Sequence, residues 1–113
     1  MSRAMFEQRI AVRGVTLRVV TDGERSRPAL VLINGAFSNL LTWTPVVAQL
    51  AERFFVVRHD WRGTGRSSGG PRAEYTFADY ADDLAALLDA IEVKRAVVWG
   101  LGFGARTAAR FAF

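Results

Sequence analysis

The stretch Ala96–Ala105 decides the fold, and it reads Ala-Val-Val-Trp-Gly-Leu-Gly-Phe-Gly-Ala. Its first four residues are apolar and include two valines, a composition that favours a short buried strand. Glycines at positions 100, 102 and 104 interrupt this strand, and the residues that follow them favour a helix. We therefore expect a strand over 96–99 that enters a helix through a sharp, glycine-rich turn.

Two functional interpretations of this turn compete. The first is a nucleophile elbow, Gly-x-Ser-x-Gly, in which a strand-to-helix turn lifts the nucleophile above the sheet. The nucleophile would stand at position 102, but Gly102 has no side chain with which to attack. The second is a dinucleotide-binding fingerprint, Gly100-x-Gly102-x-x-Ala105, in which helix N–H groups hold a pyrophosphate. A third possibility is purely structural, because glycine relaxes a turn with positive φ.

Apolar runs upstream of the turn predict the other central elements. Two continuous runs, 29–33 and 54–57, have the length and composition of strands that are buried on both faces. A helix is expected between these runs, over 44–53, with Pro45 in its first turn. Another helix is expected between the second run and the strand over 96–99.

The first two segments of the chain, 5–12 and 15–20, are expected to form a hairpin, because Gly14 supplies a tight turn between them. The later order is strand, helix, strand, helix, strand, helix, which favours a parallel sheet with helices on both faces. The predicted fold class is therefore α/β, with a mostly parallel sheet and an antiparallel N-terminal hairpin.

The helix after position 75 has the clearest start signal. Thr76 and Asp79 form the capping pattern Thr-x-x-Asp, in which each residue satisfies a free backbone N–H of the other. Apolar side chains then recur at helical spacing, at Tyr80, Leu84, Leu87, Leu88 and Ile91. Asp82 and Asp83 are expected to lie on the solvated face of this helix.

Length and composition limit the classes of protein that remain. With 113 residues the chain holds one domain at most. It has no cysteine and one histidine, which excludes disulfides, thiolate catalysis and histidine-cluster metal sites, and no cofactor or metal is predicted. The net charge of +4 comes from scattered arginines, so neither nucleic acid nor membrane is expected as a partner. No membrane-length apolar run or secretory signal is visible, and a cytoplasmic location is expected.

A second motif follows the strand expected over 54–57. It spans Asp60–Ser67 and reads Asp-Trp-Arg-Gly-Thr-Gly-Arg-Ser. This segment resembles the Asp-x-Arg-Gly-x-Gly-x-Ser loop of the α/β-hydrolase superfamily. Asn34-Gly35 stands where that family usually has His-Gly, and the glycine turn stands at the place of its nucleophile elbow. Together the three motifs, in family order and spacing, extend the resemblance over residues 8–113.

The resemblance implies roles for individual residues. Gly102 would occupy the position of the nucleophile serine. The backbone N–H groups of Ala36, or less favourably Phe37, and of Phe103 would form the oxyanion hole. Asp60 would support the site through hydrogen bonds rather than react.

The resemblance also implies which catalytic groups are missing. In this family the acid and the histidine follow the nucleophile, and the chain ends before either position. His59 precedes the turn and lies at the end of a different strand, so we do not expect it to act as the base. Trp43, Trp61 and Trp99 are expected to pack in the protein rather than to hold a substrate.

The implied fold is an incomplete α/β-hydrolase fold with strands 1–5 in the order 1-2-4-3-5. Residues 1–113 are expected to form a single partial domain that ends within the helix after the elbow, with the fifth strand as an uncovered apolar edge. The expected function is that of a small-molecule ester, lactone or C–C bond hydrolase, truncated and inactive as written. The alternative is a non-catalytic interaction protein, because glycine at the nucleophile position also resembles the N-myc downstream-regulated family, which lacks the triad.

Overall fold

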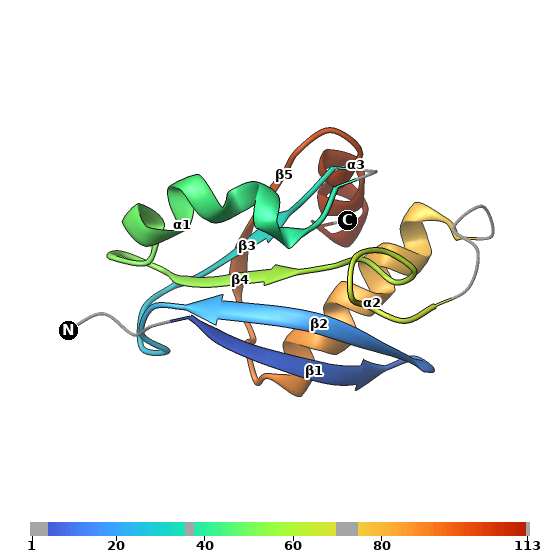
Figure 1. Ribbon diagram of the computed structural model, residues 1–113, viewed down its shortest axis with the longest axis horizontal. Helices are drawn as coiled ribbons and strands as arrows, with labels where there is room; N and C mark the ends of the chain where they lie inside the picture. Colours follow the sequence, from blue (N-terminus) through green and yellow to red (C-terminus); the bar gives the residue numbers. More distant parts are fainter. Residues whose placement is uncertain (1–4, 36–37, 70–74, 113) are drawn as a thin grey trace.

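The computed structural model describes residues 5–35, 38–69 and 75–112. Within these residues five strands form one sheet, with three α-helices and a short 3-10 helix packed against it (Figure 1). The strands are β1 (Phe6–Val12), β2 (Val15–Asp22), β3 (Ala29–Ile33), β4 (Phe55–His59) and β5 (Ala96–Gly100). The helices are η1 (Leu40–Trp43), α1 (Thr44–Leu50), α2 (Phe77–Ala90) and α3 (Phe103–Ala112).

The strands lie in the order β1-β2-β4-β3-β5, which is the order that the resemblance implied. β2 is antiparallel to both of its neighbours, whereas β3 is parallel to both β4 and β5. The carboxyl ends of β3, β4 and β5 therefore lie at the same end of the sheet. The loops that follow these three strands meet there, and they are Asn34-Gly35, the Asp60–Ser67 loop and the glycine turn.

The predicted N-terminal hairpin is confirmed. β1 and β2 pair from Phe6 opposite Thr21 to Val12 opposite Val15. Arg13 and Gly14 connect them with φ angles of 45° and 83°, the positive values that a two-residue hairpin turn needs.

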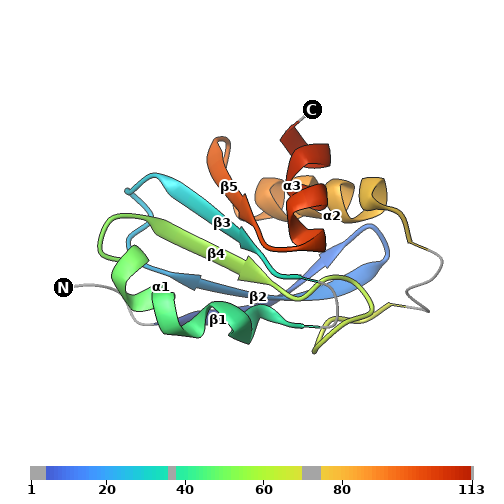
Figure 2. The same cartoon turned by 90° about the horizontal axis from the view of Figure 1, so that it is seen from above.

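Helices cover both faces of the sheet, as predicted (Figure 2). On one face α1 and η1 pack their apolar side chains, Trp43 and Val47 among them, against β3 and β4. On the other face α2 and α3 cover the larger core, in which Leu84 and Leu87 are fully buried. None of the helices in the described residues is long and apolar enough to span a membrane.

Several element boundaries differ from the sequence-based expectation, and β2, for example, runs to Asp22 rather than to residue 20. α1 ends at Leu50 rather than at residue 53, because the chain turns there to enter β4, and the Phe54 N–H closes the turn by donating to the Leu50 carbonyl at 2.9 Å. β4 continues two residues beyond the predicted end, since Arg58 and His59 still pair with β2. The capping box at the start of α2 forms as predicted.

β5 is the edge strand of the sheet, as expected, but it is half exposed rather than buried. Val97 and Trp99 keep 59% and 51% of their surface accessible, because the apolar residues beneath α1 come from β3 and β4 and not from β5. Trp99 nevertheless packs its ring on buried Trp43, with 5.5 Å between ring centroids. Trp61 is also buried, against Tyr80, so the packing role expected for the tryptophans is confirmed for Trp43 and Trp61 and is partial for Trp99.

Candidate active site

The glycine turn joins the carboxyl end of β5 to α3. Gly102 has a φ of +60°, and α3 begins at the next residue, Phe103. The Leu101 N–H donates to the Ile33 carbonyl at 3.0 Å, and the Ala105 N–H donates to the Gly102 carbonyl at 2.9 Å. The turn is therefore a sharp strand-to-helix elbow that is hydrogen-bonded to the end of β3.

The three glycines of the elbow are needed for different reasons. A Cβ atom at Gly104 would overlap the carbonyl oxygens of Ile33 and Asn34, and one at Gly100 would overlap the Gly104 carbonyl. Among the described residues, a Cβ atom at position 102 would meet only the Cα atom of Gly35, at an ordinary contact distance of 4.0 Å. Gly100 and Gly104 are thus required by close packing, whereas no described residue crowds Gly102, which is favoured by its positive φ. The same strand, turn and helix suit the dinucleotide fingerprint, so pyrophosphate binding there stays a prediction.

The predicted oxyanion donors are only partly within the described residues. Phe103 is the first residue of α3, and its N–H donates to no acceptor in the ranges that the structure describes. Ala36 and Phe37 lie outside those ranges. Their neighbour Gly35 lies beside the elbow, and the Ser38 hydroxyl donates to the Gly35 carbonyl at 2.8 Å.

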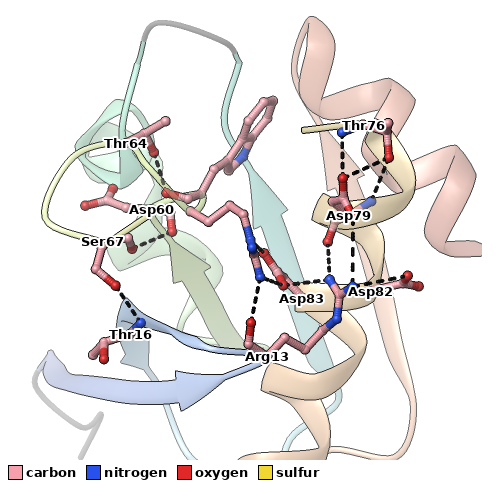
Figure 3. Close-up of polar contacts among 12 residues, drawn as sticks. Arg13, Thr16, Asp60, Thr64, Ser67, Thr76, Asp79, Asp82 and Asp83 are labelled. Carbon is pink, nitrogen blue, oxygen red and sulfur yellow. Dashed lines mark hydrogen bonds and ion pairs between the residues drawn. The ribbon is translucent and has the colours of Figure 1, made fainter. Parts of the chain in front are cut away.

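Asp60 fastens the Asp60–Ser67 loop to the segment that follows β3. Its carboxylate is fully buried and accepts the Leu40 N–H at 2.8 Å and the Arg66 N–H at 2.9 Å. The Ser67 hydroxyl donates to the Asp60 carbonyl at 2.7 Å (Figure 3). Every one of these contacts holds backbone in place, as expected for a supporting residue. Asp60 therefore ties together two loops at the same end of the sheet as the elbow.

The expectation that Asp83 faces solvent is wrong. Its side chain keeps 2% of its surface accessible, whereas that of Asp82 keeps 65%. The carboxylate accepts hydrogen bonds from Arg62 at 2.6 and 2.8 Å and from Arg13 at 2.9 Å (Figure 3). The hydrogen bonds that the Arg62 guanidinium donates to Asp83 raise its pKa. A buried carboxylate in α2 thus holds both the Asp60–Ser67 loop and the hairpin turn.

A signal for this cluster was present in the sequence. Position 83 lies three residues after Tyr80 and four before Leu87, so it falls within the apolar stripe of α2 and not on the opposite face. A charged residue in such a stripe needs a partner of opposite charge. Arg62 supplies that charge from 21 residues away in the chain. No local sequence pattern identifies it as the partner of Asp83.

His59 lies apart from the elbow, as expected. It is the last residue of β4, pairs with Val19 of β2, and is separated from β5 by the whole of β3. Burial lowers the pKa of its imidazole from 6.5 to about 4, and the nearby carboxylates of Asp60 and Asp83 offset this only in part. His59 is therefore neutral at pH 7.

Asn34, at the place of the family histidine, is fully buried at the end of β3. Neither atom of its side-chain amide has a partner among the residues that the structure describes. Within the same residues, no group of three or more His, Asp or Glu side chains gathers as a metal site would require. Among the described residues, the elbow offers the free N–H group of Phe103 beside a position, 102, that carries no side chain.

Comparisons with known proteins agree with this geometry. A family model described as alpha/beta hydrolase fold matches residues 28–112. The chain is 32% identical over 102 residues to 3-oxoadipate enol-lactonase 2 of Acinetobacter baylyi, an alignment that covers 90% of this chain and 38% of the lactonase.

Solved structures superpose on the same elements. A hydrolase from Pseudomonas aeruginosa PA01 matches with a TM-score of 0.85 and 36% identity, over 89% of this chain and 38% of that one. Epoxide hydrolase A from Mycobacterium thermoresistibile matches with a TM-score of 0.88 and 31% identity, over 96% of this chain and 35% of that one. The chain therefore spans well under half the length of these relatives.

Proposed function

Because the chain belongs to the α/β hydrolase fold family, we propose that its elbow is that of a small-molecule hydrolase in which glycine has replaced the nucleophile. Such an enzyme cleaves an ester, a lactone or a carbon–carbon bond in a small molecule. The chain as written does not hydrolyse its substrate, because Gly102 cannot form the covalent intermediate.

The observation that carries this proposal is the geometry at position 102. The backbone has a positive φ, the flanking glycines pack against fixed carbonyl groups, and a Cβ atom at 102 would make only an ordinary contact, with Gly35, among the described residues. The elbow therefore has the geometry that would present a side chain at position 102, where the chain has glycine. Phe103 and Ala36 would supply the N–H donors to a developing oxyanion, each contributing about 3 kcal/mol to transition-state stabilisation.

The substrate class rests on the relatives. One relative is named as an enol-lactonase and one matching structure as an epoxide hydrolase. Both names describe enzymes that open a strained or activated C–O bond in a small molecule. A lactone or a simple ester is therefore the appropriate first substrate for this chain.

Hydrolysis of p-nitrophenyl butyrate and of a γ-lactone by the purified protein tests the proposal. The expected result is no turnover above the buffer rate. Phe103→Pro and Phe103→Ala form a matched pair, because proline at the first position of a helix removes the N–H with little effect on the helix, whereas alanine keeps it. Turnover that Phe103→Pro abolishes and Phe103→Ala preserves, with both variants folded by circular dichroism, would refute the inactive assignment.

A further inference from the structure

A cavity of about 510 Å³ lies at the end of the sheet opposite the elbow. Its walls come from β1, the end of β2 and the loop after it, the start of β4, and the carboxyl end of α2. Phe6 of β1 pairs with Thr21 of β2, and Phe55 opens β4 at the same end of the sheet. Figure 1 shows that β4 begins on the side of the molecule away from α3. This cavity is therefore separate from the candidate active site.

The floor of the cavity is apolar. Phe55, at its base, is 4% exposed, so the apolar surface that a ligand can reach comes from half-exposed Phe6 and from partly buried Ile10 and Ile91. The volume lies within the range of about 300–1,000 Å³ that is typical of small-molecule sites. The floor therefore suits a ring or a branched chain of a small ligand.

Arg25 places a positive charge over this floor. Its guanidinium lies 4.8 Å from the centroid of the Phe55 ring, and its Nη2 donates to the Ile91 carbonyl at 2.6 Å. A guanidinium carries five N–H donors, and in the described part of the chain Arg25 makes no other hydrogen bond. The contact with Ile91 holds the group in place at the end of α2 and leaves donors free for a ligand.

Glu92 places a negative charge in the lining of the same cavity as Arg25. Its exposed side chain makes no ion pair with any described residue. A ligand with one negative group gains from Arg25 and is kept from the Glu92 side by repulsion. A second negative group would lie against Glu92 and would weaken binding.

The geometry points to a binding site for small monocarboxylates that carry an aromatic or branched apolar group. The carboxylate accepts hydrogen bonds from Arg25, and the apolar group lies on the accessible side chains of Phe6 and Ile10. This site does not depend on the elbow, so it stands whether or not the chain hydrolyses any substrate.

A titration of the ¹⁵N-labelled protein with 3-phenylpropionate tests this site. The expected result is a saturable shift of the amide signals of Gly23, Ala90 and Glu92 at millimolar ligand. The neutral analogue 3-phenylpropionamide has the same shape, and it should bind about tenfold more weakly because it lacks the charge that Arg25 recognises. No saturable shift at these amides, or equal binding of acid and amide, would overturn the inference.

Three variants separate the roles of the charges. Arg25→Gln should weaken binding of 3-phenylpropionate about tenfold, and Glu92→Gln should strengthen it about twofold because a like charge is removed. Arg53→Gln removes an exposed arginine outside the cavity and should leave binding unchanged. Equal weakening by Arg25→Gln and Arg53→Gln would mean that net charge, and not this cavity, attracts the ligand, and the inference would fail.

Discussion

Alanine at position 102 and alanine at position 104 should have very different effects on stability, although both replace a glycine of the same elbow. At Gly102 the added methyl group meets, among the described residues, only Gly35 at 4.0 Å, so the cost is that of a non-glycine residue at a φ of +60°. That cost is about 1–2 kcal/mol. The sequence cannot separate the two positions, because both stand in the same alternating pattern.

At Gly104 the added methyl group overlaps two backbone carbonyl oxygens, those of Ile33 and Asn34, which belong to the end of β3. Neither oxygen can rotate away as a side chain would, so α3 itself has to move. Overpacking of a tight contact costs about 1–3 kcal/mol even where side chains can adjust. We therefore expect a loss of at least about 3 kcal/mol for Gly104→Ala, a large fraction of the stability of a domain of this size.

Urea unfolding of the two variants and of the unchanged protein, followed by tryptophan fluorescence, measures both effects. Gly102→Ala should lower the midpoint by the smaller amount, with an unchanged slope, and Gly102→Ser should lower it about as much because both residues add a Cβ atom at the same positive φ. If Gly104→Ala is destabilised no more than Gly102→Ala, then α3 does not pack on β3 as described. The argument that position 102 is open for a nucleophile would then fail as well.

Three further predictions concern the buried polar groups. Burial lowers the pKa of His59 to about 4, so as the pH falls the unfolded chain binds this proton before the folded chain does. The free energy of unfolding should therefore fall by on the order of 3 kcal/mol between pH 6.5 and pH 4. His59→Gln should remove most of that loss. Asp83→Asn should cost about 3 kcal/mol in urea unfolding because it leaves the largely buried Arg62 guanidinium without its carboxylate, whereas Arg13 keeps Asp79 and Asp82 as partners. Exposed Asp82→Asn should change stability by less than about 0.5 kcal/mol, and equal effects would contradict the burial of Asp83. Asp60→Asn should speed hydrogen exchange at the Leu40 amide about tenfold, since an amide group can no longer accept both of its backbone partners; an unchanged rate would show that Asp60 does not hold that segment.

Local features of the fold were predictable because each depends on residues that are close in the chain. The capping box at Thr76, the hairpin turn at Gly14 and the apolar runs of β3 and β4 each carry their cause within a few residues. The strand order required the resemblance, because pairing between β3 and β5 joins segments more than 60 residues apart and no local pattern encodes it.

The candidate site divides in the same way. Gly102 and Phe103 were placed at the elbow by the spacing of the glycines, and Asp60 was placed at the end of its strand by the motif that follows it. The burial of Asp83 was missed, because it depends on whether Arg62 and Arg13 reach α2 from other parts of the chain.

By itself the sequence determined the kinds of elements, their order along the chain and the absence of a nucleophile at position 102. These properties follow from side-chain chemistry and from periodicity within a few residues. Only the tertiary structure decided that Gly104 has no room for a Cβ atom whereas no described residue crowds Gly102. It also decided which aspartate of α2 is buried and that Arg25 lies over Phe55 at the far end of the sheet. The physical reason is that open space, burial and charge pairing depend on atoms that distant segments bring together.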